Sequence, residues 1–134
     1  MRLDSLDMTS EDRAIIYARV SAAESSHVLI THGSDGMADA AAKLATIPEK
    51  TIVLTGSLQP AAFVNNNAVF NIRCALGAFQ SLPAGAYVVM SGRIFAGNNM
   101  VKIRVQNRFE EISWPHVVYV MVQIKIEIEI DSER

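Results

Sequence analysis

The sequence predicts an α/β fold, a single-domain three-layer sandwich whose sheet is mainly parallel and of the Rossmann or flavodoxin type. Short apolar runs at residues 27–30, 51–55 and 86–90 have the pattern of strands buried on both faces. Segments of helical periodicity at residues 37–45 and 69–82 separate these runs. Strands that alternate with such helices form βαβ units, with helices on both faces of a parallel sheet.

The helix boundaries are marked by capping and breaking residues. Thr9 and Asp12 have the spacing of a capping box for a first helix over residues 10–23. Pro48 ends the second helix, because proline restricts the residue before it to extended backbone. The asparagines at residues 65–67 offer a cap for the third helix.

Composition limits the class of protein. The chain has 134 residues, half of them hydrophobic, which suits one packed domain. A net charge of −2 without a basic run argues against nucleic acid as a partner. No apolar run reaches the ~18 residues of a membrane span, and the start lacks a leader pattern, so we expect no membrane partner. The single cysteine, Cys74, fits a reducing, cytoplasmic compartment.

A polar loop at residues 31–36 follows the first strand. Ligands of doubly wound sheets bind beyond the carboxyl ends of the strands, where Ser34 and Asp35 would lie. The alternative is that one of these two side chains caps a helix starting at Gly36. Lys102 stands in a polar stretch, where a solvated surface lysine is the alternative to a functional one. We expect no metal or cofactor, because metal-ligand spacings and a glycine-rich phosphate loop are missing.

The C-terminal segment has a different pattern from the rest of the chain. Residues 117–130 alternate isoleucines with charged or amide side chains, as a half-exposed strand does. We hypothesise that this segment pairs into the sheet or across a dimer; the alternative is a vestigial tail. The chain is therefore divided into a domain at residues 1–112 and a divergent β-rich tail at residues 113–134.

Several segments occur in the order and separation of one known family. These segments are residues 4–9, 30–37, 50–60, 68–71, 88–94, 101–102 and 107–110. Ordered matches at the right separations are more specific than one short motif. In these segments the chain resembles the L-asparaginase family, in particular a short branch formed by its N-terminal domain.

The resemblance implies an amidohydrolase that converts L-asparagine to L-aspartate and ammonia, without a cofactor. L-glutamine is an alternative substrate, and a homo-oligomer is expected. Ser34 and Lys102 stand at the family's catalytic positions, a second hydroxyl and a lysine base. Asp35 and Ser5 stand where the family binds the substrate's α-amino group and α-carboxylate. His32 is not catalytic in the family pattern and is expected to be structural.

The sequence departs from the family in two places. Ser34 replaces a threonine, which keeps the hydroxyl and loses the methyl group that restricts χ1. The family's Thr-Gly-Gly-Thr-Ile loop, which carries the primary nucleophile, has no counterpart, since the chain starts after that segment and contains no Gly-Gly-Thr. The alternative function is thus a catalytically inactive remnant that binds an amino acid or acts as an oligomeric interaction module.

Overall fold

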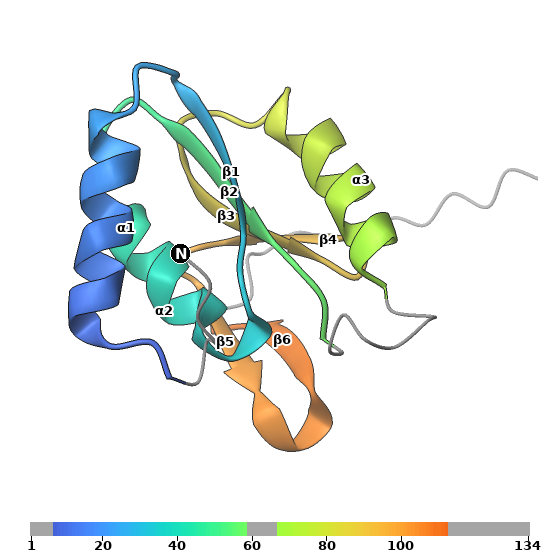
Figure 1. Ribbon diagram of the computed structural model, residues 1–134. Coiled ribbons are helices and arrows are strands. Elements are labelled where there is room, and N and C mark those ends of the chain that lie inside the picture. Colours follow the sequence, from blue (N-terminus) through green and yellow to red (C-terminus); the bar gives the residue numbers. More distant parts are fainter. Residues whose placement is uncertain (1–6, 59–66, 113–134) are drawn as a thin grey trace, which may run out of the picture.

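The computed structural model describes residues 7–58 and 67–112, and these form an α/β domain (Figure 1). The predicted fold class is confirmed. Ser5 and the alternating segment at residues 117–130 lie outside the described residues. The elements, in chain order, are α1 (Ser10–Ala22), β1 (His27–Thr31), α2 (Ser34–Leu44), β2 (Thr51–Thr55), α3 (Ala68–Phe79), β3 (Gly85–Met90), β4 (Arg93–Ala96), β5 (Met100–Ile103), the 3₁₀ turn η1 (Arg104–Gln106) and β6 (Arg108–Glu111).

The main sheet has the order β1-β2-β3-β4, and its first three strands are parallel. The register runs from His27 opposite Thr51 to Thr31 opposite Thr55. β4 is antiparallel to β3, and the turn between them has positive φ at Ser91 (52°) and Gly92 (75°). Two consecutive positive φ angles suit the right-handed twist of a two-residue hairpin. β5 and β6 form a separate antiparallel hairpin.

Helices cover both faces of the sheet: α1 and α2 lie on one face and α3 on the other (Figure 1). The larger core lies under α2, whose buried residues Met37, Ala41 and Leu44 pack against strands β2 and β3. All five residues of β2 are buried, as expected of a central parallel strand. Because β1, β2 and β3 are parallel, their carboxyl ends lie at the same edge of the sheet, where the loops that follow them begin.

The hairpin of β5 and β6 is seated against α2 by side-chain packing and by one close backbone contact. Met100 and Phe109 are buried in the larger core, and the Phe109 ring lies 6.0 Å from that of Phe95. At Gly97 a Cβ atom would stand 2.8 Å from the Ala41 carbonyl oxygen and 2.9 Å from that of Ala86. The chain leaving β4 thus passes directly against α2, which fixes where β5 starts.

Two capping predictions are corrected by the structure. α2 begins at Ser34, with Gly33 as its N-cap, so Ser34 and Asp35 lie in the first helical turn and do not cap a helix at Gly36. The N-cap of α3 is Asn67, as the asparagine run suggested, but its side chain makes no capping hydrogen bond. Its Oδ1 instead accepts a hydrogen bond from the Ser57 hydroxyl at 2.9 Å.

The predicted capping box at the start of α1 is present, and it makes stability depend on pH. The Thr9 hydroxyl accepts from the Asp12 N–H at 3.2 Å, while Asp12 accepts from the Thr9 backbone N–H at 2.9 Å. Hydrogen bonds from the Thr9 backbone and hydroxyl hold the pKa of Asp12 below its usual 3.8. The folded state therefore binds this proton less readily than the unfolded state, and the stabilisation is lost as the pH falls through the lowered pKa.

We expect Thr9→Ala to lower the free energy of unfolding by about 1 kcal/mol near pH 7, because the helix loses its cap. The difference from the wild type should shrink as the pH falls below 3.8 and through the lowered pKa of Asp12, where the folded state takes up the proton. Urea unfolding followed by circular dichroism at a series of pH values measures both effects. A difference that stays constant down to acid pH would contradict the role of the ionised carboxylate.

Gly97→Ala should lower the free energy of unfolding by about 1–3 kcal/mol, because the added methyl group meets two backbone carbonyls that cannot turn away. Gly77→Ala is the matched control, since the described residues leave open space around Gly77 on α3. Alanine there should be neutral or stabilising by roughly 0.5–1 kcal/mol. Equal effects of the two substitutions in chemical denaturation would show that the chain at Gly97 is not seated against α2.

Candidate functional site

The loop between β1 and α2 is held by its own backbone and by His32. The His32 N–H donates to the Thr55 carbonyl at 2.9 Å, which extends the contact between β1 and β2 by one residue. His32 is 9% exposed as a residue, and its Nδ1 lies 2.7 Å from the Gly33 carbonyl oxygen. Nε2 has no partner among the described residues. A buried ring bonded to its own loop holds that loop in place, directly before Ser34.

Lys102 extends from β5 to the start of α2, and its Nζ contacts two of the predicted site residues. It lies 2.8 Å from Ser34 Oγ and 2.8 Å from Asp35 Oδ1. The lysine side chain is only 7% exposed, so Lys102 is not a solvated surface lysine. Ser34 is 7% exposed, and the Asp35 side chain is 29% exposed. The structure thus brings together Ser34, Asp35 and Lys102, whereas Ser5 lies outside the described residues.

The electrostatics of this cluster are favourable on both sides. A nearly buried ammonium group is costly unless a carboxylate and further hydrogen bonds compensate it, and Asp35 and Ser34 supply both. Asp35 stands in the first turn of α2, where the helix dipole stabilises a negative charge. The ammonium keeps one N–H, and Asp35 keeps its Oδ2, without a partner within residues 7–58 and 67–112. Both groups can therefore bind a ligand.

Asn71, to which sequence analysis gave no role in the site, joins the loops around it. Asn71 on α3 is fully buried; its Nδ2 donates to the Gly56 carbonyl at 2.7 Å, and its Oδ1 accepts from the Ser91 N–H at 2.9 Å. Gly56 directly follows β2, and Ser91 directly follows β3. The signal in the sequence was slight: Asn71 lies four residues before Ala75, on the face of α3 that packs on the sheet.

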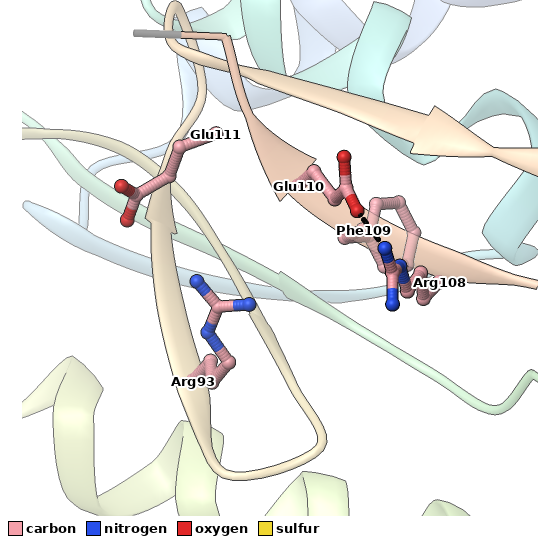
Figure 2. Close-up of a pocket in the computed structure, with 5 residues that line it drawn as sticks. All are labelled: Arg93, Arg108, Phe109, Glu110 and Glu111. Atoms are coloured by element: carbon pink, nitrogen blue, oxygen red, sulfur yellow. Dashed lines mark ion pairs between the residues drawn. The ribbon is translucent and has the colours of Figure 1, made fainter. Parts of the chain in front are cut away.

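A cavity of about 270 Å³ lies beside the hairpin, between β4 and β6 (Figure 2). Arg108 and Glu110 form an ion pair at its edge, and the Arg93 guanidinium lies 4.7 Å from the centre of the Phe95 ring. Phe109 also lines the cavity and is the strand partner of Lys102. The same hairpin therefore holds both the cavity wall and the lysine. Sequence analysis had placed Arg93, Arg108 and Glu110 in segments that match the family, but without a role in the site.

Two further properties concern the part of the chain that the structure describes. Within it, His, Cys, Asp and Glu side chains form no group of three that could hold a metal ion. Among the same residues, none of the helices has both the length and the apolar character needed to cross a membrane. The candidate site consists of the Ser34 hydroxyl, the Asp35 carboxylate and the Lys102 amine. The buried side chains of Asn71 and His32 support it.

Known proteins share this arrangement of elements. An L-asparaginase of Thermococcus kodakarensis is 32% identical over 127 residues, which is 90% of this chain and 39% of that protein. The solved structure of the thermostable L-asparaginase from Thermococcus kodakarensis superimposes with a TM-score of 0.78 at 29% identity, covering 100% of this chain and 44% of the other. L-asparaginase I from Vibrio cholerae gives a TM-score of 0.74 at 27% identity, covering 84% and 37%.

The chain spans about two-fifths of the length of these relatives. The matching family model is that of the asparaginase N-terminal domain, and the match extends over residues 1–134. The resemblance found in the sequence is thereby confirmed. With a matching family model along its whole length and a relative at 32% identity, this chain belongs to the asparaginase family.

Proposed function

We propose that this chain is an asparaginase-type amidohydrolase domain that converts L-asparagine to L-aspartate and ammonia. The observation that carries the proposal is the contact of the nearly buried Lys102 ammonium with both the Ser34 hydroxyl and the Asp35 carboxylate, each at 2.8 Å. A hydroxyl becomes nucleophilic at neutral pH only beside a base, and a lysine in a closed site can be that base. Membership in the asparaginase family supports the amide substrate.

The proposed chemistry is acyl transfer. The oxygen of a hydroxyl group attacks the amide carbon, its proton passes by way of the Lys102 amino group to the departing nitrogen, and ammonia leaves. Ser34 Oγ is already within hydrogen-bond distance of Lys102, as this step requires. Water hydrolyses the resulting ester and releases aspartate. No metal or organic cofactor takes part in the proposed reaction.

Substrate binding is assigned to carboxylate and hydroxyl groups. Asp35 directs Oδ1 to Lys102, so Oδ2 is available for the substrate's α-ammonium group. Ser5, which lies outside the described residues, is proposed to bind the α-carboxylate. L-glutamine is one methylene longer than L-asparagine and is the second substrate to test.

We further propose a cytoplasmic homo-oligomer that binds neither nucleic acid nor membranes. The charge of −2 without a basic run supports the exclusion of nucleic acid. Val69, Phe70 and Leu76 are apolar and about half exposed on α3, which supports contact with a second copy. We also propose the division into a domain at residues 1–112 and a separate segment at residues 113–134, which contains the alternating strand pattern.

The alternative function is that of an inactive domain that binds an amino acid or serves as an interaction module. It is favoured by the ion pair of Lys102 with Asp35 at 2.8 Å, since a paired ammonium can stabilise the site without acting as a base. Such a domain would keep Asp35 available for binding but would release no ammonia. Turnover and binding therefore have to be measured separately.

For turnover, we expect Lys102→Met to lower the rate of ammonia release from L-asparagine about 10²–10⁴-fold, because the base is lost. Ser34→Ala should be similarly impaired, while Ser34→Thr keeps the hydroxyl and should retain activity. Lys43→Met, at an exposed position on α2, is the matched control. A coupled glutamate dehydrogenase assay measures the ammonia. Wild-type activity in Lys102→Met would exclude the lysine as the base.

For binding, we expect Asp35→Asn to weaken the affinity for L-aspartate about tenfold or more, since a charge-assisted hydrogen bond contributes ~1.5–3 kcal/mol. Asp39→Asn, on the exposed face of the same helix, should bind like the wild type. Isothermal titration calorimetry measures both dissociation constants. Binding without any ammonia release by the wild type would establish the inactive alternative in place of the enzyme.

A further inference from the structure

Asn71 is a polar residue in a position where packing alone would favour an apolar one. It is 0% exposed on the face of α3 that packs on the sheet, beside the sulfur of Met90 at 3.6 Å from Nδ2. Burying an amide is unfavourable unless its hydrogen-bonding groups find partners. Asn71 satisfies this requirement with two backbone groups, the Gly56 carbonyl and the Ser91 N–H. The side chain thus connects three elements at the edge of the sheet where the candidate site lies.

Gly56, the first partner of Asn71, touches the loop that leads to Ser34. A Cβ atom at Gly56 would stand 2.3 Å from the His32 carbonyl oxygen and 3.3 Å from Met37 Cε. The turn after β2 and the loop after β1 are therefore in direct backbone contact. Met37 is one helical turn beyond Ser34 and packs on the same side of α2. A shift of Gly56 would act on this loop and on the first turn of α2.

The second partner, Ser91, has a left-handed backbone conformation, with a φ of 52°. This conformation is uncommon for a residue with a side chain and needs support from its surroundings. The bond from the Ser91 N–H to Asn71 Oδ1 supplies that support. It fixes the turn into β4, and β4 leads to Gly97 and the hairpin that carries Lys102. Asn71 thus acts on the two sides of the candidate site through different backbone groups.

We propose that Asn71 is a positioning residue for the site: by holding the Gly56 and Ser91 backbones, it sets the place of Ser34 and Asp35 relative to Lys102. The three side chains come from two pieces of structure that no backbone ladder joins among the described strands. Their 2.8 Å contacts tolerate displacements of only a few tenths of an ångström. The inference rests on this arrangement and not on turnover, so it stands or falls independently of the proposed function.

The test measures how well Lys102 is protected from an amine reagent. Trace labelling with acetic anhydride, read by mass spectrometry, gives the reaction rate of Lys102 relative to the exposed Lys43 in the same molecule. Asn71→Asp keeps an acceptor for Ser91 but replaces the donor to Gly56 by an oxygen that repels the carbonyl. We expect the labelling rate of Lys102 relative to Lys43 to rise roughly fivefold. This is the factor by which the loss of one net hydrogen bond shifts the equilibrium between the protected and the exposed lysine.

Thr51→Val is the matched control, because it also removes a part-buried hydrogen bond from a side chain to a backbone carbonyl. The Thr51 hydroxyl donates to the Leu82 carbonyl at 3.2 Å, at the end of β2 opposite to Gly56. Its loss should leave the relative rate at Lys102 unchanged. Equal increases in Asn71→Asp and Thr51→Val, or protection retained in Asn71→Asp, would overturn the proposal, since either result leaves Asn71 with a merely structural role.

A second pair of variants covers the case in which Asn71→Asp does not fold. Gly56→Ala displaces the same turn from His32 and should also raise the relative rate at Lys102, whereas Gly77→Ala, which adds the same methyl group in open space on α3, should not. The wild type gives an independent check. The Asn71 side-chain amide protons should exchange slowly in nuclear magnetic resonance spectra, and fast exchange would overturn the proposal even if neither variant folds.

Discussion

The fold around the candidate site depends on one nearly buried positive charge. Lys102 is 93% buried by side-chain area, since 7% is exposed, and an ammonium group in such a place must be paired. Its partners, Ser34 and Asp35, begin the helix that follows β1, and the helix dipole adds to the stabilisation of Asp35. The hairpin of β5 and β6 can therefore dock on α2 only in a register that brings Lys102 to this helix end. The same requirement that keeps the hairpin in place also creates a hydroxyl–amine–carboxylate cluster.

The parallel sheet supplies the rigid half of the cluster. β2 is buried along its whole length, and the Thr55 hydroxyl at its carboxyl end donates to the Val89 carbonyl at 2.8 Å. The Thr55 hydroxyl is thus satisfied within the sheet and the Thr51 hydroxyl by the Leu82 carbonyl in the loop before β3, so neither is available for chemistry. Asp35, just beyond β1, has one carboxylate oxygen without a partner among the described residues and can meet a ligand. This is the usual location of ligands in doubly wound sheets, and here it follows from which polar groups are already paired.

Sequence patterns predicted the parts of the fold that depend on regular burial. The strands at β1, β2 and β3 were visible because three or more apolar residues occur together between turn signals. The start of α2 was predicted too late, since serine and aspartate before a helix resemble a cap, whereas here Gly33 is the N-cap and both side chains turn to Lys102. β4, β5 and β6 have four residues each, too few for a periodic pattern. The roles of Ser34, Asp35 and Lys102 came from the resemblance, because burial patterns do not indicate which distant lysine will meet a given loop.

Asn71 illustrates a different limit of sequence analysis. Its helix was predicted, but the hydrogen bonds to Gly56 and Ser91 join residues 15 and 20 positions away, and these backbone groups have no signature of their own. A buried amide is informative only once its partners are known, since the same residue on the exposed face would be ordinary.

The division of the site between a sheet edge and a hairpin has a mechanistic consequence. The sheet edge is fixed by backbone hydrogen bonds along β1, β2 and β3, whereas the hairpin is held by the pairing of Lys102, by packing of Met100 and Phe109 and by the close approach at Gly97. Packing contacts yield more readily to small displacements than a parallel ladder does, so the distance between Ser34 and Lys102 is more sensitive to the hairpin than to the sheet. In the proposed acyl transfer the proton would cross that distance, and misplacement of a catalytic group by about 1 Å can cost roughly 10²-fold in rate. The geometry that would decide catalysis in this chain therefore lies in how β4 leads into β5, outside the parallel strands that define its fold class.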